Sequence, residues 1–356
     1  MSAATDIDSL LKGVISQHGS DLHFIAGDPP RVRQYGRLAP LQEERLAADF
    51  VQTQLYGIMS RSAQQYFERH DATDFAYSIP EVARFRVNVF RHLNGMGAVF
   101  RAIPSRALSL EELGMPQAIA RLCKQKQGLI LVTGKTGSGK STTLAAMIDN
   151  INERIKGHIL TIEDPIEFVH RRKGCLISQR EVGVHSPSFA DALHSALRED
   201  PDVVLVGELR DLETMSIAVT AAEMGILVMG TLHTNGAAAT VDRMVNTFPS
   251  DKQPHIRTML STSLRGVISQ QLVPKKGEPG RVAALEILLN TPAVANLIRQ
   301  GKLDQLENTM QSGGKTGMKT MDSALMELLD SGLISGEDAY QKAMNKPAFE
   351  QYRRLP

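Results

Sequence analysis

The chain has 356 residues, enough for two domains with sizeable cores, because a single core rarely grows beyond roughly 250 to 300 residues. Its 40 lysines and arginines balance 39 aspartates and glutamates, so no general attraction to phosphates draws it to nucleic acid, and we expect no nucleic acid among its partners. Its apolar runs are far shorter than the roughly 20 residues of a membrane helix, and its first residues lack the features of a secretory signal, which predicts a cytoplasmic protein.

The first hundred residues mix short helices and strands. TDIDSLLKGVISQHG has helical spacing, with Asp6 or Asp8 available as a cap, and SDLHFIAG alternates like a strand. A second amphipathic helix is predicted over Ala47–Phe67. TDFAYSI has the character of a strand. RFRVNVFRHLNGMGAVFRAI has the character of two strands joined by a hairpin turn near Asn94–Gly97. These patterns predict a small α+β domain over residues 1–103.

A linker is predicted over residues 104–115, where turn residues occur without sustained periodicity. From residue 116 the pattern changes to apolar strands separated by helices, which is typical of parallel βαβ units in an α/β fold. The strand candidates are LILVTG, HILTIED, CLISQRE, VVLVGE and ILVMGTLH. Helices are predicted over Thr143–Ile155, where Leu144, Met147, Ile148 and Ile151 form one stripe, and over Phe189–Leu197.

The last third, from about Asp251, is predicted to be mainly helical. Its apolar residues repeat at helical spacing and would form one face: Ile256, Met259, Leu260, Leu264, Val267 and Ile268. The second domain is therefore predicted to cover residues 116–356 and to end in helices.

A glycine-rich stretch, GKTGSGKST, directly follows the strand LILVT and opens a helix, which is the context that the motif GxxxxGK[ST] requires. Its glycines allow a tight turn in which successive amide hydrogens converge on phosphate oxygens at a helix start. We expect Lys140 to reach the β- and γ-phosphates of ATP and the Ser141 hydroxyl to bind Mg²⁺. The residues expected to hold the nucleotide are Gly134, Thr136, Gly137, Ser138, Gly139, Lys140, Ser141 and Thr142.

Three further predicted strands end in polar residues: LTIEDPIEF with Glu163, VVLVGELRD with Glu208 and MGTLHTN with His233. The carboxyl ends of parallel strands meet at one edge of the sheet, where ligands bind. An acid at a strand end is often only a helix cap, and a lone histidine is more often structural, but beside a phosphate loop the three indicate a nucleotide site. In VVLVGELRD, the place where most nucleotide hydrolases carry an aspartate is Gly207.

These motifs resemble those of the secretion-type and type IV pilus ATPases: GKTGSGKST their Walker A motif, ILTIEDPIEF their aspartate box, LREDPDVVLVGELRD their Walker B region and GTLHTN their histidine box. The resemblance covers nearly the whole chain, and segments such as GSDLHF, RFRVNVF and ISQQLVPK favour the pilus-retraction motors. It implies a PAS-like first domain, a RecA-like ATPase domain and a homohexamer that hydrolyses ATP with Mg²⁺. It also implies docking, through an inner-membrane platform protein of the pilus base, at the cytoplasmic face of the inner membrane.

The resemblance further implies roles for the site residues. Glu163 is expected to orient the attacking water and Glu208 to bind Mg²⁺ through water, although the two glutamates could exchange these roles. His233 is expected to sense the γ-phosphate, with a purely structural role as the alternative. Positive charge is expected from arginines on strands of the first domain, of which one or two could instead pair with surface acids: Arg84, Arg86 and Arg101. Arg210 could contribute or brace a loop.

Several alternatives stay open at this point. Retraction motors usually carry an arginine where TPAVANLIRQ has Ala295, which keeps open a divergent accessory retraction ATPase. A pilus-assembly or type II secretion ATPase has the same motifs, because these do not set the direction of the motor. A small-molecule phosphotransferase would need an acceptor pocket and lid, of which the sequence shows no sign. A regulatory protein that binds nucleotide without hydrolysis is a further possibility.

Overall fold

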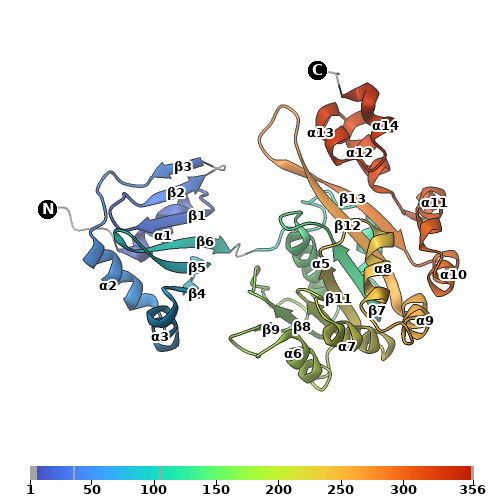
Figure 1. The fold of residues 1–356 in the computed structure, drawn as a ribbon, viewed down its shortest axis with the longest axis horizontal. Coiled ribbons are helices and arrows are strands. Elements are labelled where there is room, and N and C mark those ends of the chain that lie inside the picture. The colour runs from blue at the N-terminus through green and yellow to red at the C-terminus, as the bar shows by residue number, and fades with distance from the viewer. Residues whose placement is uncertain (1–5, 35–36, 104–105, 354–356) are drawn as a thin grey trace. The chain divides into compact units, whose positions relative to one another are not determined.

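The computed structural model describes residues 6–34, 37–103 and 106–353. The chain divides into two compact units, Met1–Arg106 and Ala107–Pro356 (Figure 1). Residues 104 and 105, where the predicted linker begins, lie outside the described residues, and Leu110 is already part of the core of the second unit. Within the described part of the chain, no helix combines the length and apolar character needed to cross a membrane.

The described residues of the first unit form a six-stranded antiparallel sheet with the order β3-β2-β1-β6-β5-β4. Its core is built from alternate strand residues, such as Phe85 and Val87 of one strand, together with apolar residues of the helices. The strands are β1 (Asp21–Ile25), β2 (Arg31–Gln34), β3 (Arg37–Pro40), β4 (Ala72–Ile79), β5 (Ala83–His92) and β6 (Gly95–Ile103), and the helices are α1 (Ile7–Ser16), α2 (Ala48–Ile58) and α3 (Arg61–His70).

The predictions for the first unit hold in part. Asp6 is the N-cap of α1, since its Oδ1 accepts a hydrogen bond of 2.7 Å from the Ser9 amide. The hairpin is confirmed, because β5 and β6 pair up to His92 and Gly95. The single helix predicted over Ala47–Phe67 is wrong, because the Ser60 side chain accepts a hydrogen bond from the Ala63 amide and so starts α3 as a separate helix. Strands β2 and β3 were not predicted.

The described residues of the second unit form a seven-stranded sheet with the order β13-β12-β7-β11-β10-β8-β9. The five predicted strands are confirmed, and all of them pair in parallel. The strands are β7 (Gly128–Thr133), β8 (His158–Glu163), β9 (Leu176–Glu181), β10 (Val203–Val206), β11 (Leu227–Leu232), β12 (Leu264–Pro274) and β13 (Arg281–Leu289). The carboxyl ends of β7, β8, β10 and β11 therefore lie at one edge of the sheet, as predicted.

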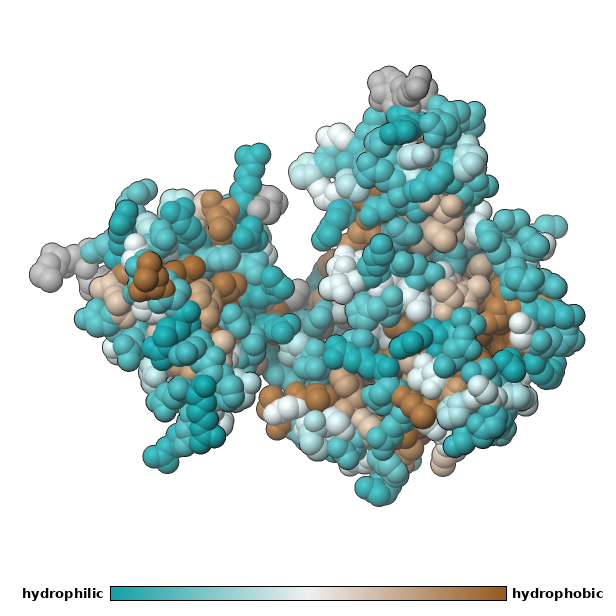
Figure 2. Space-filling model, in the orientation of Figure 1, coloured by the Kyte–Doolittle hydropathy of each residue, from teal (hydrophilic) through white to brown (hydrophobic). Residues whose placement is uncertain are grey.

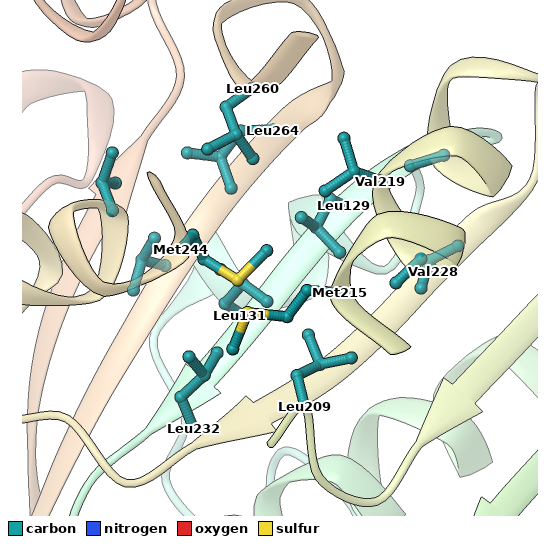
Figure 3. Packing of buried hydrophobic residues seen from close by; sticks show 14 of the residues in the cluster. Leu129, Leu131, Leu209, Met215, Val219, Val228, Leu232, Met244, Leu260 and Leu264 are labelled. Carbon is teal, nitrogen blue, oxygen red and sulfur yellow. The ribbon is translucent and has the colours of Figure 1, made fainter. Parts of the chain in front are cut away.

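Helices cover both faces of this sheet, so that neighbouring residues of one strand belong to different cores. Leu129 and Leu131 of β7 pack with α7, α8 and α9 on one face (Figure 3), whereas Ile130 and Val132 pack with α4 and α5 on the other. The predicted stripe on α5 is buried in the second of these cores. The helices are α4 (Gln117–Leu122), α5 (Lys140–Arg154), α6 (Phe189–Ala196), α7 (Leu212–Glu223), α8 (Ala237–Asn246), α9 (Gln253–Ser263), α10 (Pro292–Gln300), α11 (Leu306–Ser312), α12 (Met321–Asp330), α13 (Gly336–Lys342) and α14 (Lys346–Phe349).

The helical prediction from Asp251 onward is wrong for its central part. Helix α9 ends at Ser263, and the apolar residues from Leu264 to Ile268 belong to β12, which pairs with β7 in parallel and with β13 in antiparallel fashion. The free edge of β7 supplies a partner strand, and Gly266 allows close approach, because a Cβ there would lie 2.9 Å from the Leu288 carbonyl oxygen. The chain is helical again only from Pro292.

Hydrophilic residues cover most of the visible face of each unit, and hydrophobic residues appear there in small groups (Figure 2). Scattered exposed apolar side chains are normal for a folded protein. The polar side chains at the carboxyl edge of the second sheet are therefore more informative about function.

Candidate nucleotide-binding site

The glycine-rich loop lies between the end of β7 and the start of the 15-residue helix α5. Gly134, Gly137 and Gly139 have φ angles of 139°, 78° and 89°, a region that other residues rarely adopt. A Cβ at Gly134 would lie 2.3 Å from the Gln270 carbonyl oxygen, and one at Gly139 would lie 2.7 Å from Gln270 Nε2. The loop therefore needs its glycines for shape, and it presents its amides at the positive end of a helix.

Two side chains of the loop are suited to an anion. Lys140 Nζ donates hydrogen bonds to the carbonyl oxygens of Gly134 at 2.9 Å and Lys135 at 3.3 Å. Burial lowers the pKa of Lys140, while the negative charges of Glu208 and Glu167 oppose this shift. Within the described structure the buried hydroxyl of Ser138 has no hydrogen-bond partner. A phosphate would supply both the missing acceptor and a counter-charge, so this loop fits a nucleotide.

Glu163, at the end of β8, is buried and held by three donors. It accepts hydrogen bonds from Thr161 Oγ1 at 2.6 Å, Gln179 Nε2 at 3.2 Å and the Glu167 amide at 3.3 Å. Burial raises the pKa of Glu163, and the hydrogen bonds only partly offset it. A fixed carboxylate with a raised pKa has the character of a group that binds and orients a water molecule.

A small pocket of about 40 Å³ adjoins this carboxylate. Its volume is sufficient for a water molecule. It is lined by Ser141, Leu144, Ala145, Glu163, Phe168, His170, Leu205, Gly207 and Thr231. Burial lowers the pKa of His170 to about 4, so this histidine is neutral at pH 7. The pocket joins the predicted metal-binding hydroxyl of Ser141 to the predicted water-orienting Glu163.

Gly207, at the position of the expected aspartate, is closely packed against the neighbouring strand. A Cβ at Gly207 would lie 3.1 Å from the Ile162 carbonyl oxygen and 3.3 Å from Glu163 Cα. An acid at this position would therefore press on the strand end that carries Glu163. The chain places its acid one residue later instead, at Glu208.

Glu208 lies in an ionic cluster. Its Oε2 is 2.7 Å from an Arg210 guanidinium nitrogen, and its Oε1 is 3.3 Å from His233 Nε2. Burial by itself would raise the pKa of Glu208, but the hydrogen bond from Arg210 and the charge of His233 outweigh it and lower the pKa. Glu208 is consequently ionised at neutral pH. Arg210 and His233 also line a larger cavity of about 430 Å³, together with Thr234 and Arg243 among others.

Among the described residues no group of three or more histidine, cysteine, aspartate or glutamate side chains is suited to a metal ion. A site built from one hydroxyl and one carboxylate, completed by phosphate and water oxygens, is typical of Mg²⁺. Ser141 and Glu208 supply the hydroxyl and the carboxylate of such a site, and their binding of Mg²⁺ stays a prediction.

The three predicted arginines share one face of the first sheet. Arg84 and Arg86 are two residues apart on β5, and Arg86 stands opposite Arg101 of β6. Arg101 Nε is 2.9 Å from Oδ1 of Asp21, so this arginine pairs with an acid. The alternative prediction was pairing with a surface acid, whereas Asp21 is buried. Whether any of the three contacts a nucleotide stays a prediction.

Several supporting residues were missed by the sequence analysis. Gln270 of β12 is 2% exposed, and its Oε1 accepts a hydrogen bond of 2.7 Å from Thr143 Oγ1 in the first turn of α5. Thr161 and Gln179 hold Glu163. Thr161 and Gln270 lie within the quoted segments ILTIEDPIEF and ISQQLVPK, but the motifs give no role to either residue, and strand pairing brings them to the site.

The chain is similar to known proteins over nearly its whole length. Residues 2–334 match the model of the family described as type II/IV secretion system protein. The chain is 52% identical over 338 residues to the "Type IV pilus retractation ATPase PilT" of Pseudomonas aeruginosa, covering 95% of this chain and 98% of that protein. It is 50% identical over 346 residues to the "Twitching motility protein" of Neisseria gonorrhoeae, covering 97% and 92% of the two chains.

A solved structure described as the pilus retraction motor PilT with bound ADP superimposes with a TM-score of 0.91 at 45% identity, covering 98% of this chain and all of that one. The mixed α/β fold and the resemblance found in the sequence are thereby confirmed. The chain belongs to the type II/IV secretion system protein family.

Proposed function

We propose that the chain is an ATP-hydrolysing motor that powers retraction of a type IV pilus, and thereby twitching motility. The observation that carries this proposal is the site at the carboxyl edge of the second sheet, with its glycine-rich loop, two glutamates and a histidine. Support for retraction in particular comes from the similarity to the PilT relative, which extends over almost the full length of both chains.

Each residue of the site has a role in this proposal. The loop amides and Lys140 bind the phosphates of ATP, and Ser141 and Glu208 hold Mg²⁺. Bound Mg²⁺ neutralises phosphate charge. Glu163 orients the attacking water, because it is fixed by three donors and opens onto a pocket large enough for water. His233 reports the loss of the γ-phosphate through its contact with Glu208.

The raised pKa of Glu163 and the lowered pKa of Glu208 favour this division of labour. A carboxylate paired with Arg210 and His233 stays ionised and suits a cation, whereas the buried carboxyl of Glu163 suits exchange of a proton with water.

Arginines of the first unit supply further positive charge to the nucleotide, and the protein works as a homohexamer. One face of the paired strands β5 and β6 carries Arg84, Arg86 and Arg101, and this face would present several guanidinium groups together. In this proposal the motor acts at the cytoplasmic face of the inner membrane through a platform protein of the pilus base. The first unit is PAS-like and the second RecA-like.

Steady-state phosphate release tests the enzymatic part. Glu163→Gln should lower turnover by roughly 10² or more, the usual contribution of a positioned acid or base, and leave ATP binding within about twofold. Glu223→Gln is a matched control, because this glutamate is exposed on α7. Absence of turnover in the native protein would contradict the assignment as an ATPase and favour a regulatory nucleotide binder.

Deleting the gene tests the direction of the motor. Abundant pili without motility would support retraction, whereas cells without pili would favour an assembly motor.

A divergent accessory retraction ATPase is the second candidate, and Ala295 is the observation that favours it. Ala295 lies on α10, which follows β13 directly, at the position where retraction motors usually carry an arginine. Full ATP turnover with no twitching when this chain is the sole retraction motor would support this second candidate.

A further inference from the structure

Glu286 of β13 is a buried carboxylate that joins two helices. Its Oε1 accepts a hydrogen bond of 2.6 Å from the Ala237 amide, at the start of α8, and its Oε2 accepts one of 3.1 Å from the Met321 amide, at the start of α12. The side chain is 8% exposed. Each oxygen thus satisfies an amide of the first helical turn, where a negative charge is favourable.

The first of these helices is connected to the nucleotide site. Helix α8 follows the segment His233–Gly236, which begins with the histidine that contacts Glu208. Thr240 of α8 contacts the hydroxyl of Thr234 at 2.8 Å and that of Thr133, the last residue before the glycine-rich loop, at 3.4 Å. The His233–Gly236 segment is therefore in direct contact with the first turn of α8.

The strand pair β12–β13 supports the same junction. Ser269 stands opposite Glu286, and its hydroxyl accepts a hydrogen bond of 2.9 Å from the Gly236 amide. Gly236 has a φ of 93°, and a Cβ there would lie 3.5 Å from Glu286 Oε1. The neighbouring Gln270 contacts the first turn of α5 and packs against the glycine-rich loop. Adjacent residues of β12 thus contact both loops of the site.

The second helix belongs to a separate packing unit. Helices α12, α13 and α14, here called the C-terminal helices, pack on β12 and β13 around their own core, which includes Val273, Ala284, Leu325 and Phe349. The chain leading into α12 is fixed to β13 by two backbone hydrogen bonds between Ile287 and Lys319, of 2.8 and 3.0 Å. Glu286 is next to this bridge and adds the bond to Met321.

We propose that Glu286 couples the nucleotide site to the C-terminal helices, so that ligand-induced movement of the His233–Gly236 segment changes the hydrogen bonding at the start of α12. The proposal rests on nucleotide binding at the glycine-rich loop. One carboxylate serves both helices, so movement of α8 relative to β13 alters the geometry of both bonds. Burial raises the pKa of Glu286, and the hydrogen bonds from the Ala237 and Met321 amides oppose this shift.

Hydrogen–deuterium exchange of the full chain tests the coupling. Peptides that cover 134–142 and 319–326 are compared with and without Mg²⁺ and a non-hydrolysable ATP analogue. In the native chain both should change on binding. In Glu286→Gln the change at 134–142 should persist, and the change at 319–326 should be at least threefold smaller. The readout is a difference between bound and free protein, which a merely structural weakening would leave in place.

Glu278→Gln is the matched control, because Glu278 is an exposed glutamate of the β12–β13 turn that pairs with Lys275. It should behave like the native chain. Ser269→Ala, which removes only the hydroxyl that contacts Gly236, should also reduce the change at 319–326 and serves if Glu286→Gln does not fold. The coupling alone would be overturned by equal changes at 319–326 in the native chain, in Glu286→Gln and in Ser269→Ala. It would also be overturned if 319–326 did not change in the native chain when 134–142 is protected. No protection at 134–142 in the native chain would overturn nucleotide binding as well.

Discussion

Gly207 lies against the backbone of Glu163, so closely that a Cβ at Gly207 would be 3.3 Å from Glu163 Cα. The missing side chain is therefore a condition for the position of Glu163. The acid that follows β10, the strand beside β8, is instead Glu208. Its contacts with Arg210 and His233 lower its pKa, so that it is ionised at neutral pH.

Gly207→Ala should lower ATP turnover by at least tenfold, because the added methyl group displaces Glu163 from the orientation that its three donors set. Crowding of a packed site costs about 1–3 kcal/mol, which a denaturant titration would detect. Gly13→Ala is the control, since a Cβ at this helical position meets nothing within 4 Å. Unchanged turnover in Gly207→Ala would show that the glycine does not position Glu163.

Arg210→Gln should destabilise the folded protein at neutral pH and have less effect in acid. The folded-state pKa of Glu208 is lowered, so the stabilisation is present above its ordinary value of 4.5 and is lost as the pH falls through the lowered folded value. The free energies of unfolding of the native chain and the variant, measured from pH 7 down to about pH 3, should therefore converge as the pH falls below 4.5. A difference that is constant with pH would contradict the ionic role.

Gln270→Leu should weaken ATP binding, because it removes the acceptor for Thr143 Oγ1 in the first turn of α5 and leaves that buried hydroxyl without its partner. The loss of one buried hydrogen bond costs about 1–3 kcal/mol, which converts to roughly 5- to 150-fold in affinity if it falls wholly on the loop. Titration with a fluorescent ATP analogue measures it. Gln271→Leu is the matched control, because Gln271 is next in the strand and points to the other face.

Arg86→Gln should lower turnover by roughly 10³ or more if its guanidinium reaches the nucleotide of an assembled motor, since arginines that stabilise phosphoryl transfer contribute about 10³ to 10⁵. Nucleotide affinity should change far less. Arg31→Gln, on another strand of the same sheet, is the control. Single-turnover assays would separate the effect on hydrolysis from the effect on nucleotide affinity. Turnover equal to that of the native chain in Arg86→Gln would show that this arginine does not contribute to the site.

The sequence alone determined much of the site. The motif GKTGSGKST between a strand and a helix is local, because its glycine conformations and helix start depend on consecutive residues. Glu163, Glu208 and His233 were recognised because each follows an apolar run, and parallel strands bring their carboxyl ends to one edge. Local patterns of this kind persist in the fold because they depend on residues that are close together in the sequence.

The tertiary structure decided what depends on partners distant in sequence. Leu264 to Ile268 have apolar spacing that suits a helix, and only the free edge of β7 makes them a strand. That strand pairing brings Gln270 to Thr143, and it sets Ser269 opposite Glu286, residues that no motif connects. The pKa directions of Glu163 and Glu208 also depend on burial and on neighbouring charges. Desolvation and long-range hydrogen bonds exist only after the chain has folded, so the directions of these two pKa shifts could not be predicted from the sequence alone.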